Sequence, residues 1–256
     1  MKKIFKHILN TVPRPLLIKI SKIIKPLIPL FYYGNKYEDP IDGKTFRSFL
    51  PYGYNKIRDN VLSPSTLSLE RHRLLWLYLK NETDLLTRKQ SLLHFAPEQA
   101  FYKKFKKLNH LEYVTTDLES PLADVKADIC NLPFDNNSFD FILCNHVLEH
   151  INNDTKAMQE LFRVLKLGGT AILQIPIDEK KVKTYSDDTI TDKKRRDEIF
   201  GQYDHVRIYG QDYYDKLRSI GFEVGAVRYA KKLSQNQIDR FRINKNEAIP
   251  VCKKPI

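Results

Sequence analysis

Short apolar runs alternate with longer amphipathic stretches from Ser91 onward, and this alternation limits the fold more than any other feature of the chain. A short apolar run is typical of a buried strand, whereas apolar residues three and four apart indicate a helix. Strands and helices in alternation are the signature of βαβ units, which build a parallel sheet covered by helices. The predicted strands are Ser91–Phe95, Leu111–Thr116, Phe139–Cys144 and Thr170–Ile175.

Helical spacing and Gly residues indicate the other elements. We expect an α/β fold with a doubly wound, Rossmann-like, mostly parallel sheet of about seven strands, preceded by a helical or irregular N-terminal extension. Two charged stretches, 178–201 and 232–245, are expected outside the sheet as a lid or insertion. The predicted helices are Leu69–Leu79, Gln99–Leu108, Asp154–Leu167 and Asp212–Ile220, and the last strands are Phe222–Arg228 and an antiparallel Ala248–Cys252.

The overall composition favours one large core. The chain has 256 residues, of which 42% are hydrophobic, and its three cysteines are too few for a disulfide framework, so we expect a reducing cytoplasmic location. The net charge is +12, and residues 1–30 hold seven Lys and Arg residues and no acid. This excess favours an acidic or anionic partner.

The first 30 residues have two interpretations. Basic and apolar residues alternate at roughly helical intervals, but four prolines and the charges interrupt every apolar run, so we predict neither a membrane-spanning helix nor a secretory signal. In one interpretation the segment is an amphipathic helix in peripheral contact with the anionic inner membrane surface. In the other it is a helical arm packed on the core.

Residues that directly follow the predicted strands are the candidates for ligand binding, because ligands bind at the carboxyl ends of strands in an open α/β sheet. Asp117 ends the second strand, where a carboxylate can accept hydrogen bonds from both ribose hydroxyls of a nucleoside. Asp128 can accept from an adenine amino group while Ile129 covers the ring. Each acid alone has a plain alternative as a turn or cap residue.

Three sequence motifs in this order resemble the class I SAM-dependent methyltransferases, in particular the type 11-like group. They are ADxxxLPF at 127–134, SFDxxxxxxVLEH at 138–150 and RVLKxGG at 163–169, and the similarity spans about residues 91–228. The resemblance implies S-adenosyl-L-methionine (SAM) as cofactor. By this resemblance the ribose contacts Asp117, the adenine contacts Asp128 and Ile129, and the methionine part contacts Asn145 and His146. Leu118 is a further candidate for cofactor binding.

The loop after the first strand departs from the family pattern. Where an acid and three glycines are usual, this chain has His94, Ala96, Glu98 and Ala100, and each added methyl group hinders close approach of the backbone to a ligand. Glu98 is a candidate to bind the cationic amine of SAM in place of the missing acid, or to cap the following helix. The phrases HFAPE at 94–98 and HVRIYG at 205–210 resemble an uncharacterised bacterial subgroup of methyltransferases.

We divide the chain into a basic amphipathic segment (1–36), an N-terminal lobe with a helix (37–90) and a methyltransferase domain (91–256). The subgroup often carries two CxxC pairs in the lobe. Here the matching positions are 39–42 (Asp-Pro-Ile-Asp) and 63–66 (Ser-Pro-Ser-Thr), so we predict a degenerate zinc-ribbon-like lobe without structural zinc.

Methyl transfer to a hydroxyl needs a general base, a role that suits histidine. His146 and His205 are the catalytic candidates, His150 is a weaker one, and Arg207 and Tyr209 are candidates for binding an anionic acceptor. His146, Glu149 and His150 also match the HxxEH pattern of inverted zinc peptidases. That pattern must lie within a helix, whereas here it follows a strand, so we predict no metal site.

The acceptor class stays open at this level. We rank a small molecule, lipid or glycan above nucleic acid, because the basic run at 193–196 has acids nearby and no RNA-binding module accompanies it. The alternative to an enzyme is a non-catalytic SAM-binding or membrane-associated scaffold protein.

Overall fold

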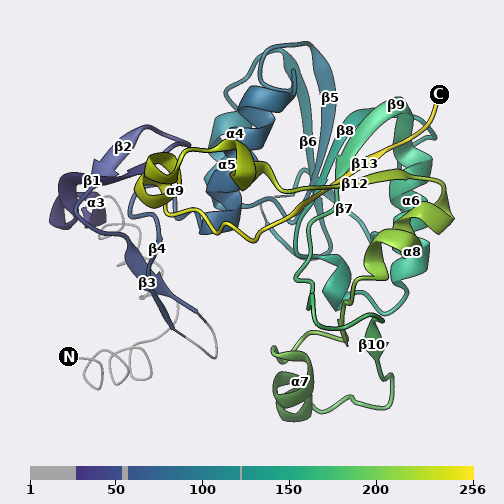
Figure 1. Ribbon diagram of the computed structural model, residues 1–256. Helices are drawn as coiled ribbons and strands as arrows, with labels where there is room; N and C mark the ends of the chain where they lie inside the picture. The colour runs from purple at the N-terminus through teal and green to yellow at the C-terminus, as the bar shows by residue number, and fades with distance from the viewer. Residues whose placement is uncertain (1–26, 54–56, 122) are drawn as a thin grey trace.

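A seven-stranded sheet forms the centre of the molecule. The computed structural model describes residues 27–53, 57–121 and 123–256 (Figure 1). The strand order is β12-β13-β9-β8-β5-β6-β7, and only β13 runs antiparallel to its neighbours. This sheet confirms the predicted α/β, mostly parallel fold. Its strands are β5 (Gln90–Phe95), β6 (Leu111–Asp117), β7 (Val125–Lys126), β8 (Phe139–Cys144), β9 (Leu165–Ile172), β12 (Glu223–Val227) and β13 (Ile249–Lys253).

Helices cover both faces of the sheet and create two hydrophobic cores (Figure 1). On one face Trp76 stacks on Phe101, and both pack with Leu92 and Phe141 of the strands. On the other face the helices pack against the opposite side of the same strands, because successive side chains of a strand point to opposite faces. The helices are α4 (Glu70–Glu82) and α5 (Gln99–Phe105) on the first face and α6 (Asp154–Val164) and α8 (Tyr213–Ile220) on the second.

The strand order reverses between β5 and β8. The chain runs outward from β5 through β6 to β7, and then returns to the other side of β5 to form β8 and β9. The loops that leave β5 and β8 therefore diverge to opposite faces. Doubly wound folds bind their ligands at this point of the carboxyl edge, which is here called the crevice.

The boundary between α6 and β9 differs from the prediction. The helix ends at Val164 instead of Leu167, and β9 begins at Leu165, which pairs with Phe139. The Gly168-Gly169 pair thus lies inside the strand. A Cβ atom at Gly169 would come within 2.8 Å of the Lys166 carbonyl oxygen, so the close approach of the backbone there requires glycine.

The N-terminal lobe contains two small antiparallel sheets, where a helical or irregular extension was expected. They are β1 (Tyr33–Asp39) with β2 (Lys44–Phe46), and β3 (Leu50–Tyr52) with β4 (Arg58–Leu62); the short helix α3 (Ile28–Phe31) precedes them. The two segments that match the CxxC positions do come together. The buried carboxylate of Asp39 accepts hydrogen bonds from the hydroxyls of Thr66 and Ser68.

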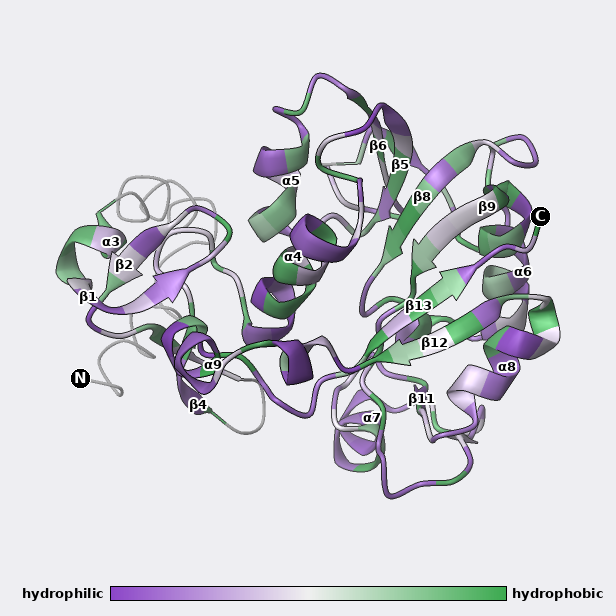
Figure 2. Cartoon of the chain, turned by 45° about the horizontal axis from the view of Figure 1, so that its top comes forward, coloured by the Kyte–Doolittle hydropathy of each residue, from purple (hydrophilic) through white to green (hydrophobic). Residues whose placement is uncertain are grey.

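The two charged stretches lie outside the central sheet, as expected, but only the first projects away from it, whereas the second packs on the N-terminal lobe. Residues 178–201 contain β10 (Tyr185–Ser186), which pairs with β11 (Arg207–Ile208), and the hydrophilic helix α7 (Lys193–Phe200), which projects beyond the sheet (Figure 2). Residues 232–245 contain α9 (Gln235–Phe241), which follows η2 (Tyr229–Lys232). Helix α9 packs on β1, where Arg240 Nε lies 2.8 Å from Glu38 Oε2, so it ties the lobe to the C-terminal part instead of acting as a lid.

Most of the basic N-terminal segment, residues 1–26, lies outside the described residues, so its contact with a membrane stays a prediction. Among the described residues, no helix is long and apolar enough to cross a membrane.

Arg73 of α4 joins three separate parts of the chain. Its side chain is fully buried and donates hydrogen bonds to the carbonyl oxygens of Val61 and Ser68 in the lobe and of Phe241 and Arg242 at the end of α9. Hydrogen bonds from a charged donor are stronger than neutral ones, and each unpaired buried carbonyl would carry a desolvation cost.

We therefore expect Arg73→Ala to lower the free energy of unfolding by about 3 kcal/mol or more, since it leaves buried carbonyl groups without donors. Urea denaturation followed by circular dichroism measures this. Arg88→Ala is the control, because the Arg88 side chain is 74% exposed and its loss should change stability by less than about 0.5 kcal/mol. A loss below about 1 kcal/mol for Arg73→Ala would contradict this role.

Candidate active site

The crevice at the carboxyl edge of the sheet brings together the loops after β5, β6 and β8. The backbone N–H of Ala96 donates to the Thr116 carbonyl at 2.9 Å, and Asn145 Nδ2 donates to Glu98 Oε1 at 3.0 Å. Ala96 and His146 both have positive φ angles, 43° and 53°. Such angles are unfavourable for residues other than glycine and are concentrated at functional sites.

The two acids predicted to hold a nucleoside lie along the same edge. Asp117 ends β6, and β7 pairs beside it in parallel, so Asp128 follows two residues after that strand. Asp117 Oδ1 accepts from the backbone N–H groups of Glu119 and Ser120, and Asp128 Oδ1 accepts from that of Cys130. Each acid therefore caps a turn with one oxygen, and both follow strands that end at the same edge of the sheet as β5.

The apolar residues beside these acids have opposite environments. Leu118, next to Asp117, is 66% exposed. Ile129 is only 5% exposed and packs into the core with Leu132 and Phe139.

Glu98 is the centre of a buried polar cluster. Its carboxylate contacts His94 Nε2 and Asn145 Nδ2, and His72 Nε2 lies 3.8 Å away. Burial alone would raise the pKa of Glu98, but the hydrogen bond and charge of His94, together with His72 and Asn145, lower it to about 2. The carboxylate is therefore ionised at neutral pH and contributes a fixed negative charge at the crevice.

His94 lies behind this carboxylate. It is fully buried, and its ring joins the Tyr113 hydroxyl, 2.9 Å from Nδ1, to Glu98. Its position under the loop suits it to hold Glu98 in place.

His72 was missed in the sequence because it lies in α4, outside the recognised motifs. Its Nδ1 accepts from the Leu69 N–H at 3.1 Å, which leaves Nε2 as the protonated nitrogen that faces Glu98. Burial and the charge of Arg71 lower the pKa of His72 to about 3, so its ring is neutral at neutral pH. The only sequence signal was its place two residues before the apolar run of that helix.

His146 is paired with Glu149 across one turn. Its Nδ1 lies 3.1 Å from Glu149 Oε1, and the ionised carboxylate can only accept, so Nδ1 is the donor. Burial raises the pKa of Glu149, but the hydrogen bond from His146 and the charges of His146 and His150 bring it below its ordinary value. The His146 Nε2 atom is buried and makes no hydrogen bond to the described residues.

His150 and His205 lie together, apart from His146. Their rings pack edge to face with centroids 4.8 Å apart, and His205 comes from the segment before β11. The three candidate histidines thus all lie around Glu149: His146 bonds to its carboxylate and lines a pocket, and the His150–His205 pair lies close to the same carboxylate.

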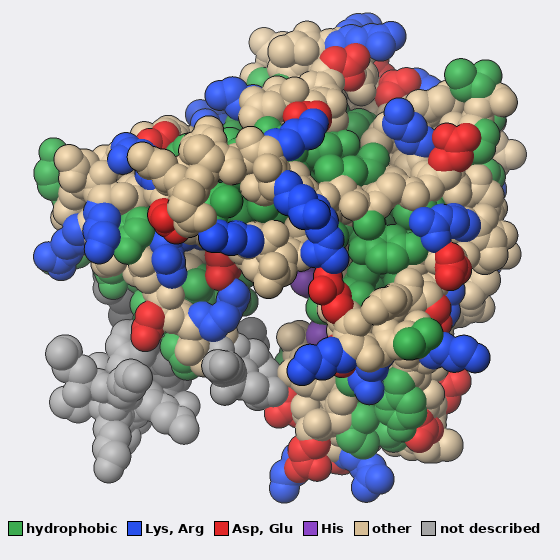
Figure 3. Space-filling model, viewed as in Figure 1, with side chains coloured by type: hydrophobic (Ala, Val, Ile, Leu, Met, Phe, Trp, Pro, Cys, Tyr) green, Lys and Arg blue, Asp and Glu red, His purple; other side chains and the backbone are tan. Residues whose placement is uncertain are grey.

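A pocket of about 340 Å³ opens next to His146. Figure 3 shows the hollow between the lobe and the sheet, with histidine side chains on its wall. The pocket is lined by residues from three parts of the chain, among them Arg58, Glu70 and Arg71 from the lobe side, Ile175 and Pro176 after β9, and Glu247 before β13. Arg71 Nε is buried there without a partner among the described residues.

Two predictions about the neighbouring residues are wrong. Arg207 and Tyr209 do not face an acceptor: Arg207 is 5% exposed and pairs with Asp154, and the Tyr209 hydroxyl donates to the same carboxylate at 2.8 Å. This buried network holds β11 against α6. Only the last three residues of the HxxEH sequence form a turn, the 3-10 helix η1 (Leu148–His150), and its first histidine, His146, lies outside that turn and bonds to Glu149. The sequence thus lacks the helical arrangement of a zinc peptidase.

Comparison with known proteins identifies similarity over part of the chain. A family model described as a methyltransferase domain matches residues 92–173, the part that contains β5, β6, β8 and α6. This match confirms, for residues 92–173, the resemblance to methyltransferases seen in the motifs.

Individual relatives match over shorter segments. An uncharacterized protein of Methanocaldococcus jannaschii is 42% identical over 57 residues, which are 22% of this chain and 25% of that protein. A 2-phytyl-1,4-naphtoquinone methyltransferase of Nostoc punctiforme is 42% identical over 52 residues, 20% of this chain and 23% of the enzyme. The matches thus span about a quarter of the length of these curated relatives.

A solved structure supports the fold over nearly the whole chain. The crystal structure of the [4+2]-cyclase SpnF has a TM-score of 0.51 and 15% sequence identity, and the match covers 93% of this chain and 96% of that one. At this identity the likeness shows the fold alone.

The buried, neutral His72 makes stability depend on pH. The unfolded chain binds a proton on this residue below pH 6.5, whereas the folded chain does so only near pH 3, so stability is lost as the pH falls through this window. We expect the free energy of unfolding to fall by about 1 kcal/mol per pH unit between pH 6 and pH 5. Urea denaturation at pH 7, 6 and 5 measures the slope.

The His72→Gln variant serves as the control for this slope. It should show a shallower pH dependence, while Glu98 contributes a loss of the same sign only below pH 4.5 in both proteins. Equal slopes for the two proteins would show that His72 is not the residue responsible.

Proposed function

We propose that this chain is a SAM-dependent methyltransferase that acts on a polar small molecule. The observation that carries the proposal is that Asn145 Nδ2 contacts Glu98 Oε1 and that Asp117 ends the neighbouring strand, at the switch point of a region that matches a methyltransferase domain. Ligands bind at this point in doubly wound folds.

The crevice fits SAM in its polar groups. Thr116 Oγ1 and Asn145 Oδ1 are buried, and neither has a hydrogen-bond partner among the described residues. Buried polar atoms without partners are costly, and a polar ligand in the crevice would satisfy them. The ionised Glu98 offers a negative charge to the cationic amine of SAM, which makes this the better of its two predicted roles.

The adenosine part fits the neighbouring edge. We assign the second oxygen of Asp117 to the ribose hydroxyls, Leu118 to the exposed side of the adenine ring, and Asp128 to the adenine amino group. When bound, SAM supplies an electrophilic methyl group attached to a sulfonium sulfur. The protein holds the acceptor in line with that methyl group, and positioning of this kind contributes much of the catalysis.

His146 is assigned as the general base. Glu149 accepts from Nδ1, so the other ring nitrogen, Nε2, carries the lone pair when the ring is neutral. Nε2 is the atom without a partner, and His146 lines the pocket. An acceptor hydroxyl in the pocket would donate its proton to this nitrogen, while Glu149 stabilises the resulting imidazolium. His205 lies away from this pocket wall and is the weaker candidate.

The pocket favours a polar acceptor of small size. Its volume of about 340 Å³ is at the lower end of the range for small-molecule sites, and its wall carries Arg58 and Arg71 as well as Glu70 and Glu247. The unpartnered Nε of Arg71 offers a donor to an anionic group of the acceptor. A wall of this composition favours an acceptor with a carboxylate or phosphate over an uncharged lipid tail.

The affinity of the Asp117→Asn variant for SAM, compared with that of the wild type, tests the proposed role of Asp117 in the cofactor site. The amide oxygen can still cap the turn at Glu119 and Ser120, but an NH₂ group replaces the second acceptor oxygen. We expect SAM to bind to the wild type and at least tenfold more weakly to the variant, as measured by isothermal titration calorimetry. Glu119→Gln is the matched control, an exposed acid two residues away. Equal affinities for all three proteins would contradict the assignment.

The rate at which a labelled methyl group is transferred from SAM tests the proposed role of His146 as general base. The wild type is incubated with labelled SAM and the small-molecule fraction of a bacterial extract, and we expect His146→Asn to transfer label about 100-fold more slowly. Asparagine tolerates the positive φ angle at this position, so the loop should keep its shape. Retention of SAM affinity within a few-fold is the control, and an unchanged rate of transfer would remove His146 from this role.

A further inference from the structure

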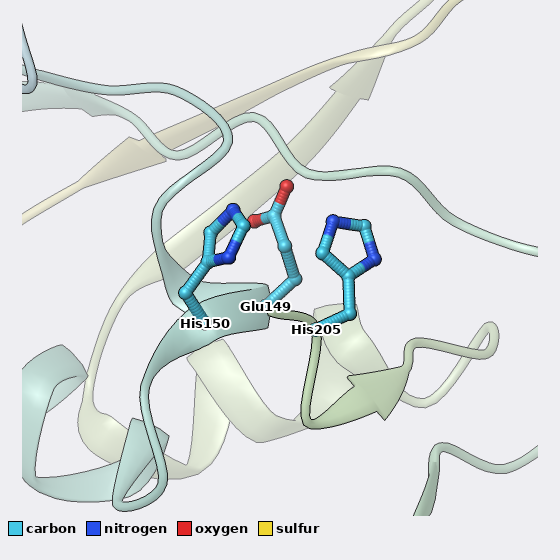
Figure 4. Close-up of side chains that lie close together, drawn as sticks. All are labelled: Glu149, His150 and His205. Atoms are coloured by element: carbon cyan, nitrogen blue, oxygen red, sulfur yellow. The ribbon is translucent and has the colours of Figure 1, made fainter. Parts of the chain in front are cut away.

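Glu149, His150 and His205 form a second cluster behind the crevice. A carboxylate oxygen and one ring nitrogen of each histidine all lie within 4.8 Å of one another, and the two imidazole rings flank the carboxylate (Figure 4). We propose that this cluster binds a divalent transition-metal cation such as Zn²⁺ or Mn²⁺. The proposal goes beyond methyl transfer and differs from the expectation that the chain has no metal site.

The hydrogen bonds of the two histidines leave one ring nitrogen of each available for a metal. His150 Nδ1 lies 3.3 Å from the Asp204 carbonyl oxygen, and His205 Nδ1 lies 3.2 Å from the Phe200 carbonyl oxygen. A carbonyl oxygen can only accept, so both Nδ1 atoms are donors and both Nε2 atoms carry lone pairs in the neutral rings. Metal-binding histidines commonly donate their second ring nitrogen to a carbonyl or carboxylate in this way.

The third ligand is a buried carboxylate with one unused oxygen. Glu149 is 1% exposed; its Oε1 accepts from His146, and its Oε2 has no hydrogen-bond partner among the described residues. An unpaired carboxylate oxygen in the interior is costly, and a cation would satisfy it.

The backbone fixes the two segments that supply the ligands. The Val206 N–H donates to the Glu149 carbonyl at 3.0 Å, so the residue after His205 is anchored to η1. Ligand atoms that lie about 2.1 Å from a tetrahedral ion are about 3.4 Å from one another. Side-chain rotations that move the ligand atoms by roughly an ångström would therefore bring them to the distances that a bound ion requires.

The ligand set indicates the class of ion. Two imidazoles and one carboxylate suit Zn²⁺, Mn²⁺ or Fe²⁺ better than Ca²⁺, which prefers six or more oxygens. Both histidines are partly exposed, which leaves open coordination positions for water or another ligand. The cluster also differs from the HxxEH arrangement, because His146 donates to Glu149 and His205 takes its place as a ligand.

Metal binding to the purified full-length chain tests the proposal without any methyl acceptor. The protein is stripped with a chelator and titrated by calorimetry with ZnCl₂ and, separately, with MnCl₂. We expect one ion per chain for at least one of these metals, and an affinity at least tenfold lower for His205→Gln and for Glu149→Gln. His110→Gln is the matched control, because His110 precedes β6 at the opposite end of the sheet, and it should bind as the wild type does.

Cobalt substitution gives a second measurement that does not depend on the stability of a variant. Co²⁺ added to the stripped wild type should give visible absorption bands typical of nitrogen and oxygen ligation, and Zn²⁺ should abolish them. Absence of binding by the wild type, or binding that His205→Gln and Glu149→Gln leave unchanged, would overturn the proposal.

Discussion

The parallel pairing of β5 with both β6 and β8 is the constraint on which the rest of this structure depends. It forces the chain to leave the sheet in opposite directions after Phe95 and after Cys144, and the space between these exits becomes the crevice. Because neighbouring parallel strands end at the same edge, Asp117 also arrives there without any contact specific to it. The sheet thus positions the candidate cofactor residues, and the loops only orient them.

Two buried carboxylates organise the polar side chains around the crevice. The Glu98 carboxylate contacts His94 and Asn145, and the Glu149 carboxylate orients His146. Each carboxylate keeps its charge in a buried place because hydrogen bonds offset the cost of desolvation. The glycine-poor loop is compatible with this arrangement, since Ala96 adopts the positive φ angle that glycine would provide, at some cost in strain.

Much of the core could be predicted from the sequence because its signals are local. The apolar runs fixed β5, β6 and β8 to within a residue, and helical spacing located α4, α5 and α8. The small sheets of the lobe were not predicted, because β1 is polar along its length and shows no apolar alternation. The end of α6 was misplaced because Gly168-Gly169 is typical of a helix end, whereas the pairing of Leu165 with Phe139 decides where the strand begins.

The site was predicted only in part, because the signals in a sequence are local and several contacts of the site are not. The residues after each strand follow from topology, but His72 and Arg71 reach the crevice and pocket from α4, and His205 reaches Glu149 from a distant segment. Contacts of this kind depend on tertiary packing, which no periodicity in the sequence encodes.

Hydrogen exchange of the backbone amides, measured by mass spectrometry with and without SAM, tests the central claim most directly. If the crevice between β5 and β8 holds the cofactor, SAM should slow exchange in the segments that follow Phe95, Asp117 and Cys144, and leave the opposite end of the sheet unchanged. Protection confined to other parts of the chain, or no protection at saturating SAM, would contradict the account.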